Sequence, residues 1–565
     1  MRFLFRTTLC LALYVTTVSQ AASGSVDTIL LGKIYTADSG NPETEALAIR
    51  EGLLVKVGSI ADVSALAGPD TEVITVEEGV IVPGFVDAHL HVAGVGSALV
   101  NVDLMSVTSF DELIERVVAR AEETPPGSVV IGRGWHQSKW QQLPDGAVGG
   151  FPTHHLLSEA VPEHPVVLEH ANGHTVLVNA QAMALSGIDQ ATAAPEGGVI
   201  VKDLDGRPTG ILHETATGLT RGLESYGPER AQYLLEIAQD HLISEGVTSA
   251  HDAGVRKVDL DAQLAAAEAG GLKVRLYSML DATDAGVMEE WLAHGLLVAS
   301  ESQRLTVRSI KVVADGALGS RTAWLHEPYT DEPETSGVST FPMEQLDALI
   351  ADTRAGNWQI NVHAIGDKAN SQVLDVFAKY LNTGNDSRFR IEHAQHILAP
   401  ELRRFAGLNV IASMQPIHLS SDRPWAIDRL GSKRIEEGAY LWQSMLASGV
   451  VVASGTDAPV EPVSAIDNFY AAVTRKQLNG LPESGFEAAE KLSREQALQA
   501  MTVAGAYAAF EEGVKGTLSP GKYADLVVLS QDIMQVPESQ IRETKVLKTM
   551  VGGRWVYEEE ASDSN

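Results

Sequence analysis

Short apolar runs alternate with helical patterns along the second half of the chain. From about Gly246 to Asp457, apolar segments of strand length end in polar residues, and segments with helical periodicity fill the intervals between them. This alternation is typical of parallel βα units. The predicted strands are residues 247–251, 273–278, 309–313, 359–363, 389–393, 410–414 and 450–453.

Helices are predicted between these strands. Residues 229–245 are periodic and stop at Gly246, residues 259–269 stop at Gly270, and residues 343–353 and 369–381 follow the same pattern. A further apolar run over residues 80–86 predicts one buried strand before His89. Eight parallel strands are the number that closes a barrel, so the predicted fold class is α/β with a TIM-type (β/α)8 barrel.

Two parts of the chain do not fit the barrel. The interval from about Gly94 to Tyr226 is too long for one loop and contains its own strand-like runs at 129–132 and 166–169, with turns expected at 197–198, 205–206 and 208–210. The two ends carry short alternating runs at 28–31, 53–57, 524–529 and 546–556, too few at either end for a separate sheet. We therefore predict a signal peptide at 1–22, a small composite β-sandwich domain from 23–78 and 516–565, a barrel from 79–93 and 227–515, and an α/β domain at 94–226 inserted between barrel strands 1 and 2.

Composition narrows the classes of function. The 565 residues carry a formal net charge of -32, so no basic surface is expected that could neutralise phosphates, and nucleic acid is excluded as a partner. A small-molecule substrate is expected, and assembly into a homo-oligomer is left open. An acidic surface also aids solubility.

The N-terminus has the pattern of a secretory signal. Basic residues in 1–6 precede an apolar stretch at 9–18 and the small residues Ala21 and Ala22, near which we expect cleavage. The apolar stretch is too short for a stable membrane anchor, so a secreted or periplasmic protein is expected. Leu9 before Cys10 argues against a lipoprotein signal. Because Cys10 is the chain's one cysteine, the mature protein would have to hold any metal with nitrogen and oxygen ligands.

Ligand-type side chains recur at the ends of the predicted strands. His89 and His91 are two positions apart and therefore share one face of a strand. A single histidine at a strand end is more often structural, and a lysine in an apolar strand is more often ion-paired. In a βα barrel, however, all carboxyl ends of the strands meet at one mouth. The joint pattern therefore predicts a metal site there, formed by His89, His91, Lys311, His363, His393 and Asp457.

Several motifs resemble those of the amidohydrolase superfamily, and within it the amidohydrolase 3 branch of YtcJ-like proteins and N-substituted formamide deformylases. They cover nearly the whole mature chain and include Pro83-Gly-Phe-Val-Asp-Ala-His-Leu-His91, Val362-His-Ala-Ile-Gly-Asp367, Arg390-Ile-Glu-His393, Ser413-Met-Gln-Pro416 and Gly455-Thr-Asp-Ala-Pro-Val460. The resemblance implies a metal-dependent hydrolase that acts on carbon–nitrogen bonds other than peptide bonds. It does not identify the substrate.

Carried over position by position, the resemblance gives each residue a role. His89 and His91 would bind a first divalent metal ion, expected to be zinc, and His363 and His393 a second one. Lys311 would bridge both ions as an anionic carbamate. If it stays an ammonium, it would repel metal, and a site with one ion is favoured. Asp457 would bind metal and act as the catalytic base, taking a proton from metal-activated water and returning it to the leaving nitrogen of an amide, N-formyl or N-acyl amine.

Four further residues are expected to contact substrate: His174, Trp135, Arg321 and Tyr440. A dipeptidase, a cyclic-imide hydrolase and an ester-cleaving enzyme on the same scaffold remain alternatives, because the ligand set does not separate them. A non-catalytic binding or regulatory protein is the remaining alternative, and its mark would be missing ligands.

Overall fold

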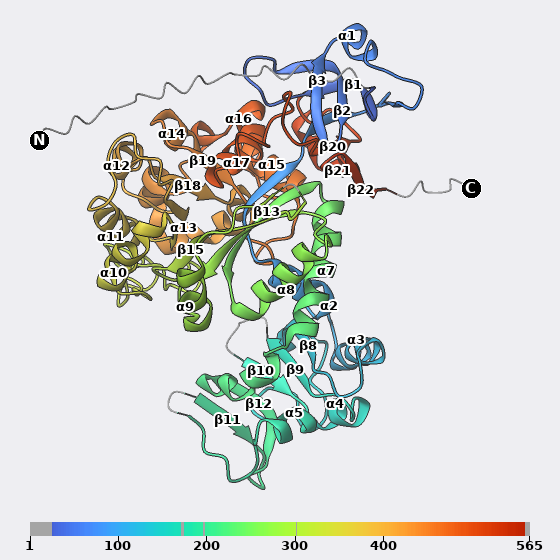
Figure 1. Ribbon diagram of the computed structural model, residues 1–565. Helices are drawn as coiled ribbons and strands as arrows, with labels where there is room; N and C mark the ends of the chain where they lie inside the picture. The colour runs from blue at the N-terminus through green and yellow to red at the C-terminus, as the bar shows by residue number, and fades with distance from the viewer. Residues whose placement is uncertain (1–24, 171–174, 196–197, 301, 560–565) are drawn as a thin grey trace, which may run out of the picture.

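The computed structural model describes residues 25–170, 175–195, 198–300 and 302–559, and the strands among them form three sheets. A parallel barrel lies in the middle, a sheet built from both chain ends lies on one side of it, and an inserted domain lies on the other (Figure 1). The expected signal peptide lies outside the described residues. Within the described part of the chain, every helix is too short or too polar to cross a bilayer.

The central sheet is a nearly closed barrel of eight strands in chain order, and every neighbouring pair is parallel, which confirms the predicted fold class. The seam lies between the first and last strands, where the Asp457 amide donates to the His89 carbonyl at 2.7 Å. A Cβ at Gly455 would lie 2.5 Å from the His89 nitrogen, so only glycine allows this approach. The strands are β6 (Phe85–Leu90), β13 (Val247–Val255), β14 (Arg275–Asp281), β15 (Leu305–Val313), β16 (Gln359–Ala364), β17 (Arg390–His393), β18 (Ile411–Met414) and β19 (Val452–Ser454).

Helices surround the barrel and bury their apolar faces against it. Ile310, Ile360 and Ile391 are fully buried in the barrel core, and each such side chain contributes about 1.5–3 kcal/mol of burial free energy. Helix α7 ends where predicted, because Gly246 adopts a φ of 79°. The helices are α7 (Pro228–Ser244), α8 (Lys257–Glu268), α9 (Ala285–His294), α10 (Met343–Thr353), α11 (Asp367–Phe377), α12 (Glu401–Leu408), α13 (Pro416–Gly438), α14 (Trp442–Ala447), α15 (Ala465–Thr474), α16 (Arg494–Ala500) and α17 (Val503–Ala508).

The single strand predicted over residues 80–86 is in fact two strands. β5 (Val80–Pro83) pairs with β20 (Leu526–Leu529) in the terminal sheet, and β6 then enters the barrel. The change of sheet occurs at Gly84, whose amide donates to Asp525 and whose missing Cβ leaves room for Thr248. Uniform apolarity hid the break, because both strands are buried along their whole length.

The two chain ends form one composite β domain, whose two groups of strands are joined at the single pair Ile34 and Ile81 of β1 and β5. Its alternate residues point to two different cores: Ile81 and Val528 to the sheet's own cluster, Val82 and Val527 to the barrel. The order is β22-β21-β20-β5-β1-β2-β3, with β4 beside β1. The elements not yet bounded are β1 (Thr28–Tyr35), β2 (Glu43–Arg50), β3 (Leu53–Gly58), α1 (Ile60–Ser64), β4 (Glu72–Thr75), β21 (Val546–Val551) and β22 (Arg554–Glu558).

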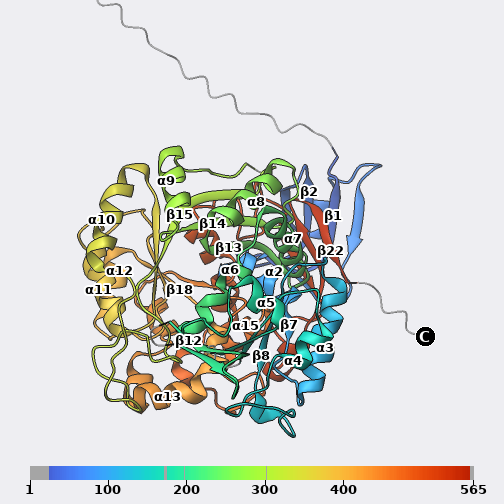
Figure 2. The same cartoon turned by 90° about the horizontal axis from the view of Figure 1, so that it is seen from below.

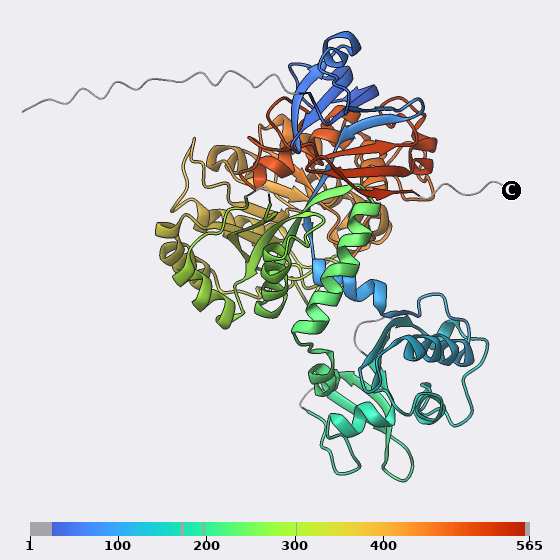
Figure 3. The same cartoon turned by 45° about the vertical axis from the view of Figure 1, so that its right-hand side comes forward.

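The inserted domain follows the first barrel strand and has its own six-stranded sheet, in the order β11-β12-β10-β9-β8-β7. Helices α2 (Val92–Val100) and α7 connect it to the barrel (Figure 3). In the view from below, it lies in front of the barrel (Figure 2). Residues 208–210 begin a strand where a turn was expected. The elements are β7 (Val102–Asp103), α3 (Phe110–Glu123), β8 (Val130–Trp135), α4 (His155–Ala160), β9 (Val166–His170), β10 (Thr175–Val178), α5 (Ala180–Leu185), β11 (Gly198–Lys202), β12 (Pro208–Glu214) and α6 (Arg221–Glu224).

Candidate metal centre

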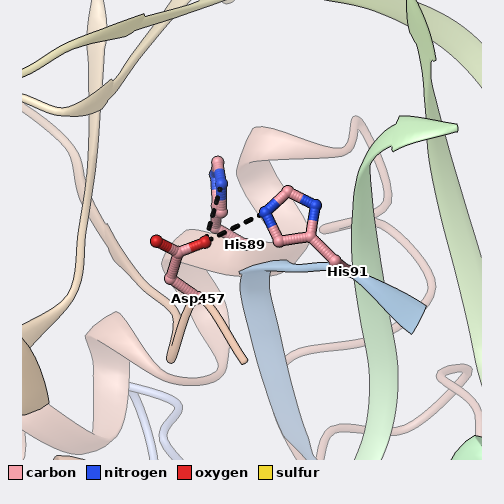
Figure 4. Close-up of side chains that lie close together, drawn as sticks. All are labelled: His89, His91 and Asp457. Atoms are coloured by element: carbon pink, nitrogen blue, oxygen red, sulfur yellow. Dashed lines mark hydrogen bonds and ion pairs between the residues drawn. The ribbon is translucent and has the colours of Figure 1, made fainter. Parts of the chain in front are cut away.

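Three predicted ligands meet at the barrel seam. The Nε2 atoms of His91 and His89 lie 3.1 Å and 3.5 Å from Oδ1 of Asp457, and Figure 4 shows both rings directed at that carboxylate. Asp457 follows β19 with a φ of 59°, a conformation that costs an ordinary residue about 1–2 kcal/mol. Its amide bond to His89 holds it there. The strain therefore persists at the point where the carboxylate turns into the mouth.

The Nδ1 atom of each of three imidazoles is hydrogen-bonded to an oxygen. Nδ1 of His89 lies 2.6 Å from Glu392, Nδ1 of His91 lies 2.8 Å from the Ala253 carbonyl, and Nδ1 of His393 lies 2.7 Å from Oε1 of Gln415. These oxygens only accept, so each Nδ1 carries the proton and donates it. The Nε2 atoms of His89 and His393 then have a free lone pair, which is the tautomer that a metal ligand needs.

The donor set fits a divalent cation. His91 faces an oxygen at both nitrogens, so its ring either carries two protons or has a cation at Nε2 in place of the second proton. The Nε2 atom of His89 is buried and has no hydrogen-bond partner within the described part of the chain. Two imidazole nitrogens and a carboxylate oxygen, all within 4.8 Å of one another, match the ligands of zinc and related ions.

The electrostatics keep three of the imidazoles neutral and the carboxylate charged, whereas the hydrogen bond to Asp457 raises the pKa of His91 although burial opposes the shift. Burial, reinforced by neighbouring positive charge, lowers the pKa of His89, takes that of His363 down to about 3 and holds that of His393 well below its usual range. Burial alone would raise the pKa of Asp457, but the hydrogen bond to His91 and the histidines around it hold that pKa well below its ordinary value. A neutral nitrogen and an ionised oxygen are the forms that bind metal.

The other three predicted ligands lie in the same mouth. His363 on β16 has its ring centroid 4.5 Å from that of His393, which is in turn 4.9 Å from that of His89. Its Nε2 lies 3.4 Å from both the Gly316 carbonyl and Asp315. Lys311 on β15 is buried, and burial lowers its pKa although neighbouring carboxylates oppose the shift. The structure thus brings all six predicted residues together.

The predicted substrate-contacting residues are placed differently from one another. Tyr440 lines a small cavity with His393, and its hydroxyl accepts from Gln395 at 2.6 Å. Arg321 is in a loop after β15 and forms ion pairs with Asp331 and Glu332. His174 lies outside the described residues.

Trp135 does not fit the expected contact with substrate. It is fully buried in the core of the inserted domain, and its Nε1 donates to the Leu168 carbonyl at 2.9 Å. The strand that it ends, β8, pairs with β9 in the inserted sheet and is not part of the barrel.

The sequence analysis did not identify three residues of the site. His418, in the first turn of α13, has Nε2 3.7 Å from Oδ2 of Asp457 and its ring nearly parallel to that of His393. Only its position two residues after the motif at 413–416 could have indicated it. Glu392 precedes His393 on β17, where His393 has a φ of 75°, and its carboxylate lies 2.6 Å from Nδ1 of His89. Asp87 accepts from the Thr456 hydroxyl at 2.6 Å and ties β6 to the seam.

Comparison with known proteins gives consistent matches over most of the chain. A model of the amidohydrolase family (Amidohydro_3) matches residues 72–557. The protein YtcJ of Bacillus subtilis strain 168 is 33% identical over 93% of this chain and 98% of its own length. The N-substituted formamide deformylase of Arthrobacter pascens is 28% identical over 94% of this chain and 98% of its own length. The crystal structure of an uncharacterized metal-dependent hydrolase from Pyrococcus horikoshii superposes with a TM-score of 0.77 at 27% identity, covering 90% of this chain and 99% of that one.

Proposed function

The chain belongs to the amidohydrolase family and is a metal-dependent hydrolase, and from this premise we propose that it cleaves the C–N bond of an N-formyl or N-acyl amine. One observation supports the chemistry above the others: imidazoles with fixed Nδ1 protons converge on one ionised carboxylate at the barrel seam. The bond class is supported by the similarity to a formamide deformylase over almost the whole chain.

In the proposed reaction, His89, His91 and Asp457 hold a divalent ion, with zinc as the expected metal. Such an ion, when bound, lowers the pKa of a coordinated water towards ~7. Asp457 is ionised and accepts the proton of the attacking water, then delivers it to the leaving nitrogen. The Glu392 carboxylate and the Ala253 carbonyl keep the two imidazoles in place during this transfer.

Substrate has a route to this carboxylate. The side chain of His91 is 39% exposed, whereas that of His89 is fully buried. Beside His91 lies an open pocket lined by Gly94, Ser97, Tyr226 and Arg256, among others, between α2 and the segment after β13. We propose that the substrate enters there and presents its carbonyl to the exposed edge of His91.

The test begins with metal analysis of the purified mature chain, before and after treatment with a chelator. The zinc-reconstituted protein is then offered N-formyl amines, N-acyl amines, cyclic imides, dipeptides and esters. We expect hydrolysis of the first two classes, lost with the chelator and restored by the metal. Selective turnover of dipeptides, cyclic imides or esters would overturn the proposed bond class, and a metal-independent reaction would overturn the mechanism.

Two further parts of the proposal come from the sequence. Export with cleavage near Ala22 is checked by N-terminal sequencing of the protein from the periplasm or medium, where a start at Met1 would contradict it. Carboxylation of Lys311 stays a prediction: the burial that lowers its pKa makes the amine a better nucleophile for carbon dioxide. Growth with labelled bicarbonate followed by carbon NMR of the intact protein would detect the carbamate.

A further inference from the structure

The two oxygens of Asp457 face two different sets of histidines. Oδ1 lies beside His89 and His91, and Oδ2 lies 3.7 Å from Nε2 of His418. Among the described residues, two groups have their ligand atoms within 4.8 Å of one another: His89, His91 and Asp457 form one, and His393, His418 and Asp457 form the other. One carboxylate is thus the common member of two clusters that each have the composition of a cation site.

His418 offers a nitrogen with no partner of its own. Its Nε2 is buried without a hydrogen-bond partner in the described part of the chain, and the residue is only 9% exposed. A buried polar atom left in this state costs about 1–3 kcal/mol. The position is nevertheless well fixed, because the Ile417 amide donates to Asn468 at 3.0 Å and anchors the start of α13. A rigid, buried and unpartnered imidazole nitrogen beside a carboxylate requires an explanation.

The segment after β18 orients the His393 ring toward the same site. Gln415 accepts from Nδ1 of His393, and three residues later the chain supplies His418. The rings of His393 and His418 are 6.2 Å apart and inclined by 11°. The lowered pKa of His393 keeps its Nε2 unprotonated. One short stretch therefore orients one imidazole and contributes another.

The surroundings favour positive charge at this place. Burial raises the pKa of Asp422 and of Glu461, while the nearby His418 lowers both. The carboxylates of Asp457 and Asp422 also raise that of Glu461.

The arrangement expected from the sequence lacks these features. His363 belongs to neither cluster among the described residues, and its Nε2 is directed at Gly316 and Asp315 rather than at Asp457. Lys311 offers oxygen ligands to a second ion only if it is carboxylated. From these contacts we propose that a second divalent cation of the zinc type binds between His393, His418 and Asp457, with Asp457 shared between the two ions. The inference rests on the proposed metal-dependent function only for the first ion.

The experiment measures metal stoichiometry, separately from activity. The full mature chain is stripped with a chelator, titrated with Co²⁺ and followed by its visible absorption, and bound metal is counted after gel filtration. We expect about two ions per chain for the wild type and about one for His418→Ala, with the first ion held as before. His363→Ala should keep two ions, and His294→Ala, an exposed histidine on α9, corrects for adventitious binding.

Each outcome decides the inference. Loss of one ion in His418→Ala but not in His363→Ala supports it, provided that circular dichroism of the metal-free proteins shows the same fold. Two ions in His418→Ala, or a wild type that never binds more than one, would overturn it. Loss of an ion in His363→Ala with none lost in His418→Ala would instead support the site expected from the sequence. A one-ion protein that still hydrolyses N-formyl amines leaves the proposed function standing, so the two failures are distinguishable.

Discussion

The amino and carboxyl ends of the barrel differ in how their buried polar groups are paired. At the amino end, Arg275 donates two hydrogen bonds to Asp525, at 2.7 Å and 3.0 Å, and its guanidinium also stacks on Tyr523. Arg390, fully buried at the start of β17, donates to the Ala508 carbonyl at 2.6 Å. At the carboxyl end, His89 and His418 each leave Nε2 without such a partner. The charges of Arg275 and Asp525 at the amino end are paired within the protein, whereas the carboxyl end has imidazole nitrogens available to a ligand.

We therefore expect the amino end of the barrel to matter for stability and the carboxyl end to matter for catalysis. A buried ion pair that loses one partner leaves an uncompensated charge, so residues at the amino end should be needed for folding. Ligand atoms at the mouth should be needed for metal binding and for turnover. Their removal should relieve local strain and charge repulsion rather than create them. Variants at the two ends should therefore affect different measurements.

The largest effect is expected for Asp457→Asn at the mouth. The amide keeps the shape of the side chain but removes the charge and the proton acceptor. Loss of one general acid–base group lowers the rate by about 10²–10⁴-fold, with a further loss if metal binding weakens. Turnover, metal content and melting temperature are to be measured on the same sample. A variant that folds, retains metal and works at the wild-type rate would show that another group handles the proton.

The next effect is expected at the opposite end, for Asp525→Ala. It leaves the guanidinium of Arg275 buried and unpaired, which should destabilise the protein by about 3–5 kcal/mol. Urea unfolding measures this change, and the turnover of the fraction that remains folded should stay near that of the wild type. The double variant Arg275→Met with Asp525→Leu is the matched control and should recover most of the loss. If the single variant instead unfolds at the wild-type urea concentration, the pair has no such role.

The contrast between the ends also explains what the sequence could predict. The barrel strands were visible because each is an apolar run of strand length that ends in polar residues, and the ligands were visible because they sit at those ends. The switch at Gly84 was hidden because the apolar run of residues 80–86 continues through it from β5 into β6. His418 was hidden because it lies on a helix, where no rule about strand ends applies. Trp135 was expected to contact substrate, but it ends a strand of the inserted sheet and is buried in the core of that domain.

A smaller effect is expected for Glu392→Gln, which tests how the mouth orients its ligands. The amide can still accept the Nδ1 proton of His89 but no longer carries the charge that strengthens this bond. Changes of this kind usually weaken metal binding by about 10–100-fold. Competition with a coloured chelator measures the affinity. Glu512→Gln, at the Arg388 pair of the amino end, is the control and should leave metal affinity unchanged; equal losses in both variants would remove the distinction between the ends.

The smallest effect is expected for Glu245→Gln at the amino end, where one carboxyl lacks the pairing that Asp525 has. Glu245 follows the last turn of α7, and burial, with a contribution from Asp467, raises its pKa from 4.5 to about 7. Its charge also meets the negative end of the helix dipole. The folded state then binds more protons than the unfolded state between pH 4.5 and about 7, so stability falls as the pH rises through this range.

Glutamine at position 245 removes this loss. The variant should match the wild type near pH 4.5 and be more stable by about 1–2 kcal/mol at pH 8, where the wild-type carboxylate is charged. Urea unfolding at several pH values measures the difference, and Glu236→Gln, an exposed position on the same helix, is the control. A gain that is the same at every pH would point to helix propensity or local packing. A gain confined to high pH would show that the amino end stabilises the fold only where its buried charges are paired.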